Sequence, residues 1–208
     1  MALEGWTVEE IDYKTAMDIV VKKHYLKRRA SCSKAFGLFS PERELMGVIC
    51  YGMPASPMPR RGICGNEFQD SVGELTRLWV DDRAPKNGES FLIGRTIRKS
   101  GYEIILSFAE IQAGHRGIVY QATNWIYTGL TSKHVEWILD GDRSKHSRHL
   151  FDQYGGVKEA RKALGDRIVR SERPRKHRYV FINAKGARRK EILAAIKYPI
   201  LPYPKEDA

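Results

Sequence analysis

The sequence predicts a single mixed α/β sheet flanked by helices, on two observations. Two apolar runs at 36–39 and 45–51 flank a short polar segment, which is typical of an antiparallel hairpin. Strand-like runs at 72–80 and 104–106 are each followed by a loop and a helical pattern, as in α/β units. Because the chain has no internal repeat, low-complexity tract or clear linker, we expect one domain over 1–208, with 184–208 as a C-terminal helical extension.

The N-terminal half begins with a predicted helix that ends near His24. Thr7 and Glu10 have the spacing of a capping box, and Tyr13 and Met17 continue an apolar stripe. After the hairpin, residues 53–68 contain three prolines and two glycines, which predicts an irregular loop.

The second half alternates strands and helices. We expect helices from Ser90, over 118–127, over 157–164 and from 187 onward, with strands at 72–80, 104–106, 134–139 and 179–182. Gly165 is expected to stop the helix at 157–164.

Charge is the most informative property of the composition. The 208 residues include 36 Lys and Arg against 25 Asp and Glu, a formal net charge of +11, which favours a polyanionic partner such as nucleic acid. A basic ribosomal or merely soluble protein is the alternative. The cations expected to contact DNA are Lys27, Arg28, Arg29, Arg60, Arg61, Arg148, Arg175, Lys176 and Arg178.

The cysteines and the N-terminus indicate the cellular compartment. Cys32, Cys50 and Cys64 form no CxxC pair, which suggests reduced thiols. The N-terminus does not resemble a signal peptide, and no apolar run approaches the roughly 18 residues of a membrane span. We therefore expect a soluble protein of the cytoplasm with no membrane partner.

Polar residues gather in two places where a site is expected. Glu110 follows the strand at 104–106, and His115, Tyr120 and Asn124 come after it, so that the four can face one pocket. The alternative is a polar, partly exposed helix. His24 and Tyr25 precede the cations at 27–29 and form either a substrate edge or a solvated turn.

Two weaker patterns are interpreted conservatively. Residues 86–90 resemble a phosphate-binding loop, although glycines at a helix start are common. His146 and His149 are three residues apart, but no cysteine or nearby carboxylate completes a zinc pattern, so we interpret them as surface cations.

The segments ELTRLWV, LSFAE, GHRG, YQATNWIYTG and KHRYVFI resemble the Mom family of phage DNA-modification proteins over about residues 20–183. The resemblance implies a fold similar to the GNAT acyltransferases. It also implies a transferase that adds a methylcarbamoyl (acetamido) group to adenine N6 in double-stranded DNA, which protects phage DNA from host restriction enzymes. Iron dependence is associated with the family, and the donor, acetyl-CoA or another small molecule, is not assigned.

The resemblance also implies roles for individual residues. Glu110 stands where the family has an Asp, and it is the candidate base or metal ligand. Asn124 has the donor and acceptor pair that matches an adenine edge. The expected catalytic residues are His24, Tyr25, Glu110, Tyr120 and Asn124, the expected cofactor-binding residues are Arg77 and Ser90, and the expected iron ligands are His24, Glu110 and Tyr120.

Two other functions compete with this interpretation. The first is a non-catalytic DNA-binding protein, for which the cations supply affinity. The second is an acetyltransferase that acts on a protein or a small amine, which follows from analogy of fold alone.

Overall fold

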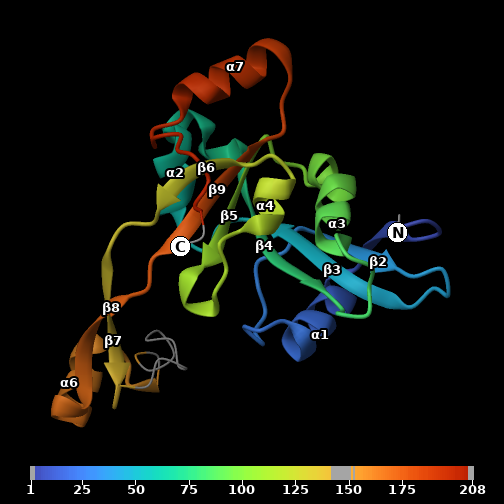
Figure 1. Cartoon of the computed structure of the whole chain (residues 1–208). Coiled ribbons are helices and arrows are strands. Elements are labelled where there is room, and N and C mark those ends of the chain that lie inside the picture. The colour runs from blue at the N-terminus through green and yellow to red at the C-terminus, as the bar shows by residue number, and fades with distance from the viewer. Residues whose placement is uncertain (1–2, 142–150, 152, 206–208) are drawn as a thin grey trace.

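A seven-stranded mixed sheet forms the body of the protein in the computed structural model, which describes residues 3–141, 151 and 153–205 (Figure 1). The strand order is β1-β2-β3-β4-β5-β9-β6, and all neighbours are antiparallel except β4 and β5. Helices α3 (Gly88–Thr96) and α4 (Ile118–Ala122) pack on one face, while α1 (Tyr13–Lys23), α2 (Pro57–Cys64) and α7 (Gly186–Ala195) cover the other. The predicted mixed α/β sheet flanked by helices is confirmed.

The N-terminal segment, where the sequence predicts the start of a helix, forms a strand. β1 (Thr7–Ile11) pairs with β2 (Lys34–Phe39), and α1 starts only at Tyr13. The helix starts there because the Asp12 carboxylate accepts the backbone N–H of Thr15 at 2.9 Å, which is an N-cap. The prediction that this helix ends near His24 is confirmed, since His24 is its C-terminal cap.

The segment at 53–68 is not the irregular loop that its prolines predicted. α2 occupies Pro57–Cys64 and a 3₁₀ helix follows over Asn66–Ser71. The Ser56 hydroxyl caps α2, and Pro57 stands at its first position, where a proline costs no hydrogen bond. The prolines therefore begin a helix here instead of preventing one.

The predicted hairpin is present as β2 and β3 (Leu45–Gly52), and β3 pairs with β4 (Val72–Val80). β4 and β5 (Ile104–Glu110) are parallel, but they pair only between Val72–Glu74 and Ile104–Leu106. Beyond Glu74 the two strands separate, since β4 stays with β3 and β5 stays with β9 (Lys176–Ile182). A wedge therefore opens in the middle of the sheet.

The expected helix at 118–127 ends early. α4 ends at Ala122, Asn124 adopts a left-handed φ of 59°, and the chain reverses into β6 (Ile126–Leu130), which pairs with β9. An asparagine tolerates this conformation better than most residues, and the β-branched and aromatic residues after it suit a strand.

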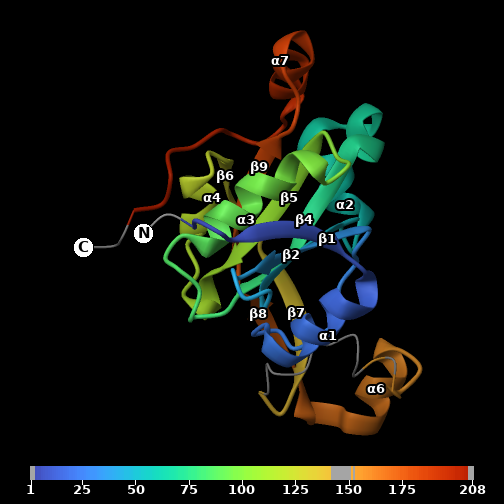
Figure 2. The ribbon, with the colours of Figure 1, turned by 90° about the vertical axis from the view of Figure 1, so that its right-hand side faces the viewer.

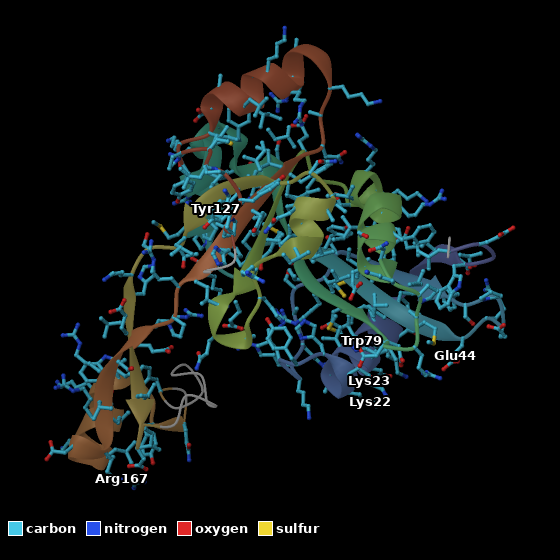
Figure 3. All side chains as sticks on the ribbon, viewed as in Figure 1. Lys22, Lys23, Glu44, Trp79, Tyr127 and Arg167 are labelled. Carbon is cyan, nitrogen blue, oxygen red and sulfur yellow. The ribbon has the colours of Figure 1, made fainter. Side chains whose placement is uncertain are left out.

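A separate arm projects from the body. It consists of β7 (His134–Leu139) and β8 (Ile168–Arg173), which form a two-stranded sheet, with α6 (Val157–Leu164) beside it (Figures 1 and 2). The guanidinium groups of Arg161 and Arg170 lie 4.8 and 5.7 Å from the centre of the Trp137 ring. Arg167 pairs with Asp140 near the far end of this arm (Figure 3). β8 was not predicted, because its charged residues hide the strand pattern.

The C-terminal segment docks on the body. The buried Ile192 of α7 packs with residues of β5 and β9, and the Tyr203 hydroxyl donates to the Trp125 carbonyl at 2.8 Å. Within the described part of the chain no helix is long and apolar enough to cross a membrane.

Candidate active site

The wedge between β4 and β5 opens into a cavity of about 1100 Å³. Its walls come from the second half of β4, from the end of β5, from the segment after α1 and from the loop that leads into α4. Seven of its lining residues belong to the catalytic, cofactor-binding or DNA-binding residues predicted from the sequence: His24, Tyr25, Arg28, Arg29, Arg77, Tyr120 and Lys176.

His24 is neutral in this cavity at neutral pH. Burial lowers its pKa to about 4, and the nearby Arg77 and His115 add to this effect. Its Nδ1 accepts the backbone N–H of Leu26 at 3.1 Å, so in the neutral ring the proton resides on Nε2. His24 is therefore a hydrogen-bond donor at Nε2 at neutral pH, and the lone pair of its Nδ1 is engaged by the backbone.

Tyr25 connects His24 to Glu110 at the end of β5. The two aromatic rings stack with centroids 4.4 Å apart, and the His115 ring packs edge-to-face with Tyr25 at a centroid distance of 5.2 Å. The Tyr25 hydroxyl donates to Glu110 at 3.3 Å, while Lys176 of β9 forms an ion pair with the other carboxylate oxygen at 3.1 Å. Burial and the Glu110 carboxylate raise the pKa of Tyr25 to about 12, so it remains a phenol.

Arg77 supplies a positive charge on the β4 wall. A bulge in β4 opposite Cys50 and Tyr51 inserts one extra residue, and the Arg77 guanidinium donates to the carbonyls of Arg28 and Arg29 at 3.4 and 3.3 Å. No carboxylate pairs with it in the part of the chain that the structure describes, and its buried Nε has no hydrogen-bond partner there. Burial and Arg28 lower its pKa, as expected for a cation that lacks a counter-ion.

Tyr120 lies deep in the cavity, where α4 packs on the sheet. The hydroxyl of Ser107 lies 2.8 Å from the Tyr120 oxygen and 3.2 Å from the Leu75 carbonyl, so its single proton is shared between two acceptors. Burial raises the pKa of Tyr120 to about 12. Gly117 permits this packing, since its φ is 77° and a Cβ there would overlap the Tyr179 ring.

Other predicted site residues lie elsewhere. Asn124 is exposed just after the end of α4, beside the C-terminal tail, where it contributes to a second, smaller pocket. Ser90 donates to the Asn87 carbonyl at 3.0 Å in the first turn of α3, and it does not line the cavity. These two assignments stay predictions that the geometry of the cavity does not support.

The predicted DNA-binding cations lie in several different places, and only some of them are at the cavity. Arg28, Arg29 and Lys176 line the cavity, and Lys27 is exposed beside it. Arg60 and Arg61 bond to Asp70 and Gln69 next to α2, and Arg175 donates to the Thr131 carbonyl. Arg178 is buried, with its guanidinium 3.4 Å from the centre of the Tyr198 ring, and Arg148 lies outside the described residues.

The residues predicted to bind iron do not fit a metal. The lone pair of His24 Nδ1 is engaged by a backbone N–H, Glu110 is held by Tyr25 and Lys176, and Tyr120 is a buried phenol. Among the residues that the structure describes, no three His, Cys, Asp or Glu side chains come close enough to hold a metal ion. The expectation of an iron site on these side chains is therefore not supported.

Further charged residues that were not predicted as site residues also line the cavity, among them Glu74, Arg116 and Arg173. His115, which was expected to face the same pocket as Glu110 and Tyr120, lines it as well. Glu74 could have been identified as a site residue, because a carboxylate between the buried Gly73 and Leu75 is unusual in a central strand. His115 and Arg116 lie in the GHRG segment, and Arg173 lies at the base of the arm.

The fold and the cavity define an α/β protein with an open, cation-lined cleft that contains a phenol and carboxylates. The sequence profile of the Mom protein family matches residues 5–205. The chain therefore belongs to the Mom protein family, and the resemblance noted in the sequence is confirmed.

One curated relative and several solved structures are similar to this chain. The relative is described as "Methylcarbamoylase mom" from Escherichia phage Mu and is 33% identical over 128 residues, which cover 59% of this chain and 53% of the relative. The chain thus matches about half the length of that relative.

The similar structures are acetyltransferases. The ribosomal-protein-S5-alanine acetyltransferase from Vibrio fischeri has a TM-score of 0.49 at 11% identity and covers 86% of this chain and 94% of its own. The putative acetyltransferase yncA from Salmonella typhimurium, solved with acetyl-CoA, has a TM-score of 0.48 at 12% identity and covers 88% and 97% of the two chains.

Proposed function

We propose that this protein is a DNA-modifying transferase that adds a methylcarbamoyl (acetamido) group to adenine N6 in double-stranded phage DNA, in the host cytoplasm, and so protects that DNA from host restriction. Membership of the Mom family and the name of the phage Mu relative support this proposal. The observation that carries it is the convergence of His24, Tyr25, Arg77 and Tyr120 on one cavity, with Glu110 bonded to Tyr25.

The cavity has room for a purine and for part of a donor. Its volume of about 1100 Å³ slightly exceeds the roughly 300–1,000 Å³ that is usual for small-molecule sites. Adenine N6 is paired inside a duplex, so the base has to leave the stack before it can enter. The exposed cations at 27–29 beside the cavity are suited to hold the phosphates next to such a base.

Each side chain of the cavity has a different role in the proposed reaction. The Nε2–H of His24 and the phenol of Tyr120 are donors, suited to the ring nitrogens of a purine or to a negative charge that develops on the donor. Arg77 lies where it can stabilise an anionic leaving group, such as a phosphate or a thiolate. Glu110 holds Tyr25 and Lys176 in place. Acetyl-CoA or another small molecule is the proposed donor.

One experiment separates this function from its competitors. The protein is expressed in bacteria that carry a plasmid, the plasmid DNA is digested to nucleosides, and their masses are measured. We expect a deoxyadenosine derivative that carries one additional methylcarbamoyl group. An unchanged nucleoside profile together with salt-sensitive DNA binding would indicate a non-catalytic binder. Transfer of isotope from labelled acetyl-CoA to protein or to a small amine would instead indicate an acetyltransferase.

A further inference from the structure

We propose that Glu74 is a catalytic residue of this cavity, the general base that takes the proton from the attacking adenine amine. This inference rests on the proposed function and assigns a residue to one step of it. The geometry points to Glu74, because it is the last residue of β4 that pairs with β5 before the two strands separate. It therefore lies at the apex of the wedge, among the residues that line the cavity.

Glu74 is a half-buried carboxylate of the cavity wall with capacity to accept a proton, whereas Glu89 and His115, which also line the cavity, are exposed. No hydrogen bond or ion pair engages Glu74 within residues 3–141, 151 and 153–205. Glu110 differs, since both of its oxygens are engaged, one by Tyr25 and the other by Lys176. His24 is also unsuited to be the base, because its Nδ1 already accepts the Leu26 N–H.

The surroundings of Glu74 suit a base that works near neutral pH. Burial raises its pKa to about 7, although the positive charges of Arg77 and Lys176 oppose the increase. A general base is most effective when its pKa lies near the operating pH. The charge of Glu74 also helps to raise the pKa of Tyr120, so the phenol stays protonated as a donor while the carboxylate accepts.

Bonds, electrons and the proton are all accounted for in the proposed step. The N6 nitrogen forms a bond to the transferred carbon of a small-molecule donor that carries the complete methylcarbamoyl (acetamido) group, and the bond from that carbon to the donor's leaving group breaks with its electron pair. The N6–H proton passes to the Glu74 carboxylate and is later released to solvent. Arg77 lies on the same wall of the cavity, where it stabilises the departing anion.

The test compares Glu74→Gln and Glu74→Asp with the wild type on duplex DNA, with clarified extract of host cells that lack this protein as the source of donor. The rate of modified adenine formation is measured from pH 5.5 to 8.5. Glu42→Gln is the matched control, because Glu42 is exposed in the turn between β2 and β3. Melting curves and DNA binding establish that each variant folds.

We expect the wild-type rate to rise with pH through about 7. Glu74→Gln should lower the rate about 100-fold or more and remove this rise, while Glu74→Asp should keep the rise at a reduced rate. Glu42→Gln should match the wild type. A Glu74→Gln variant within threefold of the wild-type rate, with the same dependence on pH, would overturn the assignment to Glu74 alone. Absence of modified adenine with the wild type would instead contradict the proposed function, and the role of Glu74 with it.

Discussion

The hydroxyl of Tyr25 donates a hydrogen bond to the carboxylate of Glu110 at 3.3 Å, although 85 residues separate them in the chain. Tyr25 follows the end of α1, and Glu110 ends β5, so the bond joins the two sides of the cavity. Because Lys176 pairs with the same carboxylate, the contact also reaches β9 and the base of the arm.

This connection predicts that Tyr25 and Glu110 act as one unit. Tyr25→Phe keeps the ring and loses the bond, and Glu110→Gln weakens the acceptor and removes the ion pair. We expect each variant to reduce modification about 10-fold, and the double variant to cost much less than the product of the two. The measurement is a double-mutant cycle of modification rates. Fully multiplicative effects would show that the two residues work independently.

Because His24 is buried and neutral, we expect the free energy of unfolding to depend on pH. Its pKa is about 4 in the folded protein against 6.5 in the unfolded chain, so the unfolded chain binds more protons between these values. The free energy of unfolding should fall by roughly 3 kcal/mol as the pH decreases from 6.5 to below 4, and this contribution should be complete above pH 6.5.

His24→Gln tests this prediction, since glutamine does not titrate. Denaturant unfolding curves at pH 4 and pH 7 should show a smaller difference for the variant than for the wild type. An equal difference in both proteins would place the pKa of His24 near its ordinary value.

Gly117 and Gly114 provide a matched pair on one loop. Both have left-handed φ values, 77° and 72°, but an added Cβ at Gly117 overlaps the Tyr179 ring, whereas at Gly114 it meets nothing within 4 Å. Gly114→Ala should cost about 1 kcal/mol from backbone strain alone. Gly117→Ala should cost about 2–4 kcal/mol, because the Tyr179 ring also has to shift. Thermal unfolding of both variants is the measurement, and equal costs would show that the ring shifts freely.

Arg178 is predicted to stabilise the fold and to contribute little to binding DNA. It is buried over Tyr198 and donates to the Thr128 carbonyl at 2.8 Å. Arg178→Ala should cost about 2–4 kcal/mol of stability, with the salt dependence of DNA affinity unchanged. The measurements are unfolding by denaturant and DNA binding at several salt concentrations.

Arg28 and Arg29 should behave in the opposite way. Replacing both with alanine should leave stability within about 0.5 kcal/mol and reduce the slope of log affinity against log salt by about one per residue that contacts a phosphate. An unchanged slope would show that these two cations do not contact DNA.

Much of the fold could be predicted because local patterns decide it. The hairpin of β2 and β3 and the start of α3 follow from runs of apolar residues and from the turn and loop residues between them. The errors arose where one residue changes the backbone. Asp12 begins α1 later than Thr7 indicated, Ser56 caps a helix in a segment rich in proline, and Asn124 turns the chain out of α4.

The site could be predicted only in part. Arg77 was found because a family motif marks it, whereas His24 and Tyr120 were also found from the polar and charged residues around them. The convergence of the three depends on topology that spacing does not encode. Glu74 was not found, because its importance comes from the separation of β4 and β5 around it. Arg178 illustrates the opposite error, since a cation in a basic run is buried under an aromatic ring.

The most direct measurement of the central claim is tandem mass spectrometry of nucleosides from DNA isolated after expression of the wild-type protein and of Tyr120→Phe. The account predicts that the wild type yields a modified deoxyadenosine whose added mass remains on the base fragment, and that Tyr120→Phe, folded and able to bind DNA, yields much less. Unmodified adenine from cells that contain the folded wild-type protein, or an added mass on another base, would contradict it.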